Sequence, residues 1–162
     1  MIPFYAPEIR LTPLSLSDGV GTLALDFSRG AWNVNSIVFS IDIDTTRFTF
    51  DPEIDVRFPV HEPSNVSLSY DVSDSDGEID ILISDLGSVL PEGLLLEIDL
   101  HLVEGAAGWG QMVSFSMDPP VSFGDDEGRG LYGLASVVSS VFTDGFESGD
   151  TSAWSMTDGE SY

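Results

Sequence analysis

The sequence predicts an all-β protein: a two-sheet β-sandwich with jelly-roll topology, about nine strands and little helix. Alternation of apolar and polar residues, the pattern of a strand with one buried face, recurs in five stretches, at 23–27, 37–43, 66–72, 79–83 and 94–102. Turn-forming residues separate the stretches at roughly 8 to 12 residues, a spacing typical of sandwiches. No 3.6-residue periodicity persists over three turns. Because each sheet would have one apolar face, two sheets must stack.

The first half of the chain is predicted to contain five strands, at 8–14, 20–28, 34–44, 47–51 and 54–58. Pro13 cannot donate a ladder hydrogen bond, so we expect the first of them at a sheet edge. The interior is expected to be sealed by Phe39, Ile81 and Ile98, with their polar neighbours left to meet another molecule.

The second half begins with a hairpin, in which strands 65–72 and 78–85 flank the turn Ser73–Gly77. Further strands are predicted at 93–103, 111–117 and 131–142, with 121–130 as a loop. From Asp144 onward the composition becomes small and acidic. We therefore expect a sandwich over 1–143 and an acidic, Gly/Ser-rich C-terminal tail over 144–162.

Charge narrows the choice of partners. The chain has 28 acidic and five basic residues, a formal net charge of −23, and no lysine. Such a polyanion repels nucleic acid and anionic lipid, so neither is expected as a partner, and no apolar run approaches the ~20 residues that cross a bilayer. It could attract cations or a basic protein face, or simply be a solvating surface in a saline or extracellular setting.

The residues offer little support for an enzyme. Cysteine is absent, and the two histidines, His61 in a loop and His101 on an outward strand position, lie in no recognisable nucleophile motif. Carboxylate pairs carry little information, because 28 acids supply many accidental pairs. We predict that the protein is not an enzyme.

No metal or other cofactor is assigned from the residues. Aligning Gly77 with the glycine of a calcium loop would place Val72 and Ile83 at ligand positions, and neither can ligate. The loop 125–127, or Asp42 with Asp44 and Asp51, could hold a cation loosely. Calcium therefore stays open.

Sugar binding is an alternative from the same fold class, because carbohydrate modules often present a line of exposed aromatic rings. The candidates are scattered among loops: Trp32, Trp109, Trp154, Tyr5 and Tyr132. They define no platform, and Trp32 and Trp109 could equally cap the core.

The layout resembles a cohesin domain, the jelly-roll module that receives dockerins in cellulosome-type assemblies. The resemblance runs over about residues 8 to 142, through the segments GVGTLALDFSRG, VNSIVFSIDIDTTRFTFDP, DGEIDILISD, PEGLLLEIDLHLV and FGDDEGRGLYGLASVVSSV. It is one of spacing and pattern, and related carbohydrate-binding modules share the jelly roll.

The resemblance implies a non-catalytic module that grips a dockerin-type helix with one sheet face, which includes the third, fifth and sixth strands. Any calcium would belong to the dockerin. The matching outward positions, which we predict to bind the partner, are Ser40, Asp42, Asp44, Ser69, Asp71, Glu78, Asp80 and Leu82, with Ser67 and Ser84 beside them. An ordinary solvated sheet face would show the same residues.

The expected location is secreted or on the cell surface, since the segment DGFESGDTSAWS resembles one that recurs near the ends of secreted bacterial proteins. Residues 1–10 lack the pattern of a signal peptide, which leaves a mature secreted chain or a cytoplasmic protein open. A third function stays open beside protein and sugar binding: a subunit of a surface filament or layer that assembles through its termini.

Overall fold

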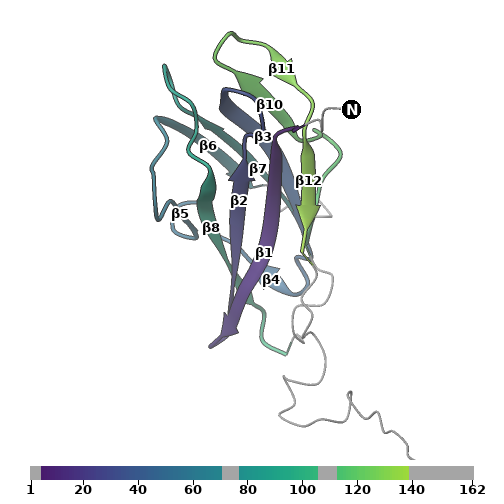
Figure 1. Cartoon of the computed structure of the whole chain (residues 1–162). Coiled ribbons are helices and arrows are strands. Elements are labelled where there is room, and N and C mark those ends of the chain that lie inside the picture. Colours follow the sequence, from purple (N-terminus) through teal and green to yellow (C-terminus); the bar gives the residue numbers. More distant parts are fainter. Residues whose placement is uncertain (1–4, 71–76, 106–112, 139–162) are drawn as a thin grey trace, which may run out of the picture.

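A computed structural model describes residues 5–70, 77–105 and 113–138, which form two stacked sheets (Figure 1). Sheet A runs in the order β12 (Leu134–Val137), β1 (Glu8–Ser17), β2 (Val20–Ser28), β8 (Gly93–Leu102) and β4 (Phe48–Thr49), and β5 (Val56–Arg57) also pairs with β8. Sheet B runs in the order β11 (Gly130–Leu131), β10 (Ser122–Asp125), β3 (Val34–Ile43), β7 (Glu78–Ser84) and β6 (Asn65–Tyr70), and β9 (Val113–Phe115) also pairs with β3. The predicted all-β sandwich is confirmed.

The core lies between the sheets and is built from the inward positions of the alternating strands. Phe39, Ile81 and Ile98, which were expected to seal it, are each at most 1% exposed. Phe27 of sheet A and Phe123 of sheet B stack across the interior with ring centroids 6.5 Å apart. Each such side chain contributes roughly 1.5–3 kcal/mol by leaving water, so burial between the layers holds the two sheets together.

The expected edge position of the first strand is wrong, because β1 lies between β2 and β12 (Figure 1). The pairing with β12 is parallel and extends only from Glu8 to Leu11. Pro13 therefore lies beyond the end of β12, where its missing N–H breaks no ladder, and a register shift follows between Pro13 and Ser15.

The segment 121–130, predicted as a loop, instead contains β10 and the start of β11. Strands of two to four residues that include glycine are too short for a period of two to be recognised. Phe123 is nonetheless buried against the core, and a Cβ on Gly124 would lie 2.4 Å from Ser36 Oγ of the adjacent β3. The glycine permits the close approach of β10 to β3.

Strict alternation also fails at the start of β8. The pairing with β2 shifts register between Leu25 and Asp26, so that Leu94 is only half-buried while Leu95 is buried. A β-bulge of this kind changes which side chain faces the core, and alternation alone does not reveal it.

The described residues include no helix that is long and apolar enough to span a membrane. The predicted tail over 144–162 lies outside the described residues, so the division after residue 143 stays a prediction.

Candidate functional site

Three neighbouring strands of sheet B present a polar outer face, which we call the β3–β7–β6 face. Their register places Ser40 opposite Asp80, Asp42 opposite Glu78, and Ser69 on the other side of Asp80. The face is made of the residues that alternate with the buried ones, namely Ser36, Val38, Ser40, Asp42, Ser67, Ser69, Glu78, Asp80, Leu82 and Ser84. Six of the eight predicted binding residues therefore lie together.

Asp80 is the centre of this face. The hydroxyl of Ser40 donates a hydrogen bond to Asp80 Oδ1, and the hydroxyl of Ser69 donates to Asp80 Oδ2 at 3.2 Å. The carboxylate is therefore held from both sides, by β3 and by β6.

Ser40 was predicted to contact a partner. It is not available for such a contact, because it is completely buried although its side chain faces outward. The backbone N–H of Ser116 donates to the Ser40 carbonyl at 2.8 Å, and Pro119 lines the same surface pocket as Ser40. The segment Ser116–Pro119 thus runs beside β3 at the border of this face, where it continues the pairing of β9 with β3. Ser40 positions Asp80 instead of offering a contact of its own.

Glu78 lies among other acids. Ser116 Oγ donates to Glu78 Oε2 at 3.0 Å, which lowers the carboxyl pKa, but desolvation and the neighbouring Asp80 and Asp42 outweigh it. The net pKa of Glu78 is raised. The electrostatic potential around Glu78 is therefore strongly negative, which favours the approach of a positively charged group from a binding partner.

Apolar groups accompany the acids. Leu82, one of the predicted binding residues, is 38% exposed and can offer an apolar contact. Met117, between Ser116 and Pro119, is 81% exposed. Met117 was not among the predicted residues. Its neighbour Ser116 contacts Glu78 and Pro119 lines the pocket beside Ser40, contacts that depend on tertiary structure, whereas in the sequence the Pro119-Pro120 pair signals no more than the end of a strand.

One predicted residue, Asp44, does not join the face. Asp44 follows the last residue of β3 and accepts hydrogen bonds from the Thr46 N–H, at 2.9 Å, and from the Thr46 hydroxyl, with Arg47 at 3.4 Å. The Thr46 hydrogen bonds, together with Arg47, lower the pKa of Asp44. Its carboxylate therefore stabilises a turn. Asp71 lies outside the described residues.

Comparisons with known proteins bear on this arrangement. No protein-family model matches the chain, and no curated protein matches it. Solved structures do: the sixth cohesin of scaffoldin B from Acetivibrio cellulolyticus, in complex with a Cel5 dockerin mutant, has a TM-score of 0.62 at 17% identity over 82% of this chain and 94% of that one. The chain has the cohesin fold.

Two further cohesins show the same likeness over 83% of this chain. One, in a type I cohesin–dockerin complex from Clostridium thermocellum, has a TM-score of 0.58 at 16% identity and is covered over 90% of its length. The other, a non-cellulosomal cohesin from the archaeon Archaeoglobus fulgidus, has a TM-score of 0.51 at 14% identity and is covered over 92%. At such identities the likeness concerns the fold of the chain, not its partner.

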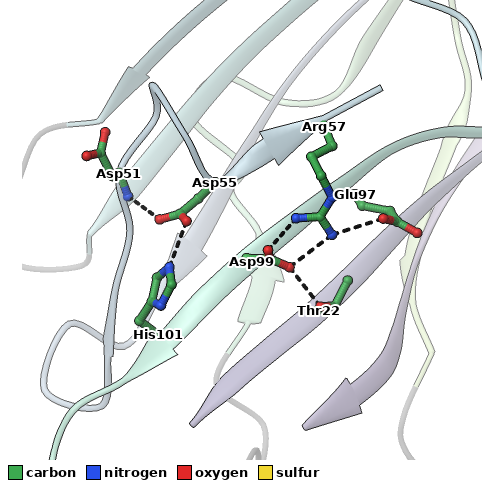
Figure 2. Close-up of polar contacts among 7 residues, drawn as sticks. All are labelled: Thr22, Asp51, Asp55, Arg57, Glu97, Asp99 and His101. Carbon is green, nitrogen blue, oxygen red and sulfur yellow. Dashed lines mark hydrogen bonds and ion pairs between the residues drawn. The ribbon is translucent and has the colours of Figure 1, made fainter. Parts of the chain in front are cut away.

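The outer surface of sheet A in this cohesin-like domain carries a second polar cluster (Figure 2). Arg57 of β5 contacts Asp99 with both terminal nitrogens and Glu97 at 3.0 Å. Thr22 Oγ1 donates to Asp99 at 2.7 Å. The hydrogen bond from Arg57 is the main cause of the lowered pKa of Asp99. The cluster ties β5 to β8 and β2.

His101 and His61 each form a pair with the carboxylate of a buried aspartate. His101 Nε2 lies 2.7 Å from Asp55, and His61 Nε2 lies 2.6 Å from Asp85, and each carboxylate is less than 5% exposed (Figure 2 for His101). Within the described ranges, neither ring is hydrogen-bonded to a serine hydroxyl. The His101 pair fastens the turn that contains Asp55 to β8, and the His61 pair fastens a loop to Asp85, the residue that directly follows β7.

The loop expected to hold a cation loosely is occupied by the chain's own groups. Asp125 is buried and accepts from the Glu127 and Arg129 N–H groups, at 3.0 and 2.7 Å, and from Arg129 Nε at 2.7 Å. Desolvation raises the pKa of Asp125, but the hydrogen bonds lower it by more than desolvation raises it. The net pKa of Asp125 is therefore below its usual range. Nowhere in 5–70, 77–105 or 113–138 do three or more acidic or histidine side chains gather to hold a metal ion.

The aromatic candidates for a sugar platform are dispersed. Trp32 packs against the core as a partly buried residue, which favours the capping alternative over exposure to a sugar. Tyr5 and Tyr132 are 60% and 98% exposed, but neither belongs to a strand of the β3–β7–β6 face. Trp109 and Trp154 lie outside the described residues.

Proposed function

We propose that this chain is a non-catalytic module that binds a partner protein, of dockerin type, through the β3–β7–β6 face. The observation that carries the proposal is that Asp42, Glu78, Asp80 and Leu82 converge on one face of a cohesin fold. Two structural neighbours are cohesins in complex with dockerins. The non-cellulosomal neighbour allows that the partner belongs to another kind of assembly.

Electrostatics supports a protein partner with a basic surface. The face combines three carboxylates with one exposed leucine, and opposite charge on the partner would accelerate encounter and set orientation. Affinity would come mainly from apolar contacts such as Leu82, because exposed charge pairs contribute little.

Sugar binding has less support. None of the described residues of this face is aromatic, whereas sugar rings bind best against exposed aromatic rings. Assembly through the termini concerns segments outside the described residues, so the structure supplies no argument for it.

The decisive experiment introduces a charge at the face. Leu82→Arg should abolish capture of the partner from secreted proteins of the source, and lower the affinity for the isolated partner at least about thirtyfold, as for a buried hot spot. Leu134→Arg, at a 59% exposed position of β12 in sheet A, adds the same charge elsewhere and should bind as the parent does. Equal binding by both variants, measured by calorimetry, would refute the assignment of the face.

Export from the cell is part of the proposal. An acidic surface without lysine suits an extracellular or saline medium, where salt screens self-repulsion within about 10 Å. Fractionation of the source culture tests it: the protein should appear in the medium or on the cell surface, and recovery only from the cytosol would contradict it.

A further inference from the structure

A shallow pocket lies at the centre of the β3–β7–β6 face. Its lining residues come from three strands and from Pro119 of the segment that follows β9: Val38, Ser40, Ser67, Ser69, Asp80, Ile81, Leu82 and Pro119. Asp80 is the one charged group in this lining. Val38, Leu82 and Pro119 supply apolar walls beside it. The pocket therefore combines one negative charge with an aliphatic surface.

The carboxylate of Asp80 is oriented by two serine hydroxyl groups and can accept further hydrogen bonds. Ser40 and Ser69 each donate one hydrogen bond, to different oxygens of the carboxylate. An ionised carboxylate offers about four acceptor positions, so these two bonds leave acceptor capacity on both oxygens. Because Ser40 is completely buried, the orientation of Asp80 is maintained without help from a partner.

Most arginines of this chain form ion pairs with acids that do not line the pocket. Four of the five arginines make ion pairs with acids of sheet A or of turns: Arg10 with Glu8, Arg47 with Asp44, Arg57 with Glu97 and Asp99, and Arg129 with Asp125 and Glu127. No ion pair among the described residues involves Asp80 or Glu78. Among the described residues, Asp80 and Glu78 are therefore not neutralised by an ion pair with an arginine or histidine of their own chain.

We propose that this pocket receives an arginine side chain of the partner. The proposal rests on the proposed function of the face and names the chemistry of its central contact. A guanidinium is planar, weakly hydrated and able to donate two parallel hydrogen bonds to a carboxylate. Its aliphatic stem would lie against Leu82, Val38 and Pro119 while the head group meets Asp80. An ammonium group has neither the flat surface nor the paired donors.

The test uses the full chain and a small probe, N-acetylarginine methylamide, followed by amide chemical shifts. Shift changes should saturate and should be centred on Ser69, Asp80 and Leu82. The citrulline analogue, which has nearly the same shape without charge, should cause none. Asp80→Asn should weaken probe binding at least about fivefold, as expected for the loss of one charge-assisted pair.

Asp26→Asn is the matched control, because Asp26 is an exposed acid on β2 of the opposite sheet. It makes the same change in net charge and should alter probe affinity less than about twofold. Unchanged amide shifts outside the pocket show that both variants fold. N-acetyllysine methylamide, titrated in the same way, should bind more weakly than the arginine probe. Changes spread evenly over the acidic surface, equal effects of the two variants, or equal binding of the lysine and arginine probes would overturn the proposal.

The outcomes separate this proposal from the function on which it rests. If Leu82→Arg abolishes partner binding while Asp80→Asn does not weaken it and the probe does not bind, the face docks a partner without an arginine in the pocket. If the probe binds at Asp80 but Leu82→Arg leaves partner binding intact, the pocket stands and the assigned docking face is wrong.

Discussion

Replacement of Asp55 tests whether the histidine–carboxylate pairs stabilise the fold or perform chemistry. Asp55 is only 3% exposed and accepts two hydrogen bonds, from the Asp51 N–H at 2.7 Å and from His101 Nε2 at 2.7 Å (Figure 2). Its own carbonyl accepts from the Asp99 N–H at 2.9 Å, a bond that an alanine would keep. The perturbation is therefore confined to the side chain.

The magnitude follows from these two bonds. In Asp55→Ala the Asp51 N–H loses its acceptor, at about 1.5–2 kcal/mol, the lower part of the range for a hydrogen bond to a charged group. The His101 ring is 44% exposed and regains water, so its loss costs about 0.5–1 kcal/mol. The free energy of unfolding should fall by about 2–3 kcal/mol, which for a chain of this length lowers Tm by about 4–12 °C.

The assay is thermal and urea unfolding of Asp55→Ala beside His101→Ala. The histidine variant removes only one of the two bonds and should lose about 0.5–1 kcal/mol. Partner binding should be unchanged in both, because the pair lies on sheet A, away from the β3–β7–β6 face. Equal destabilisation by the two variants, or loss of binding by a variant that still folds, would refute the reasoning.

Two further predictions concern the edges of the proposed face. Gly77→Ala should lower the free energy of unfolding by roughly 1–3 kcal/mol, measured by urea unfolding. Gly77 has φ +61°, and an added Cβ would lie 2.3 Å from Thr45 Cγ2 and 2.9 Å from the Ile43 carbonyl oxygen. A stability equal to that of the parent would contradict this argument from backbone strain. Glu78→Gln should raise Tm at neutral pH, because folding raises the pKa of this carboxyl. Between the ordinary and the raised pKa the folded state therefore binds more protons than the unfolded state, and the stability of the fold falls as the pH rises through that window. The gain in Tm should therefore shrink as the pH is lowered past the ordinary glutamate pKa of about 4.3, and a gain that does not change with pH would show that repulsion is not its cause.

The sequence by itself determined the two-layer fold and the identity of most face residues. A period of two reports directly which side chains leave water, and this is why Phe39, Ile81 and Ile98 were placed correctly in the core. The outward neighbours, among them Asp80 and Leu82, followed from the same alternation. What the pattern could not indicate were short strands such as β10 and the shifted register at Leu94 and Leu95.

Only the tertiary structure decided how those outward residues are used. Ser40 is buried although it faces outward, and its neighbours include Asp80 of β7 and a segment more than seventy residues later in the chain, Ser116–Pro119. The pairing of Asp55 with His101 likewise depends on a contact between distant segments. Alternation is a local property that one strand can satisfy alone, whereas a surface is shared by strands and loops whose separation in sequence carries no information about their distance in space.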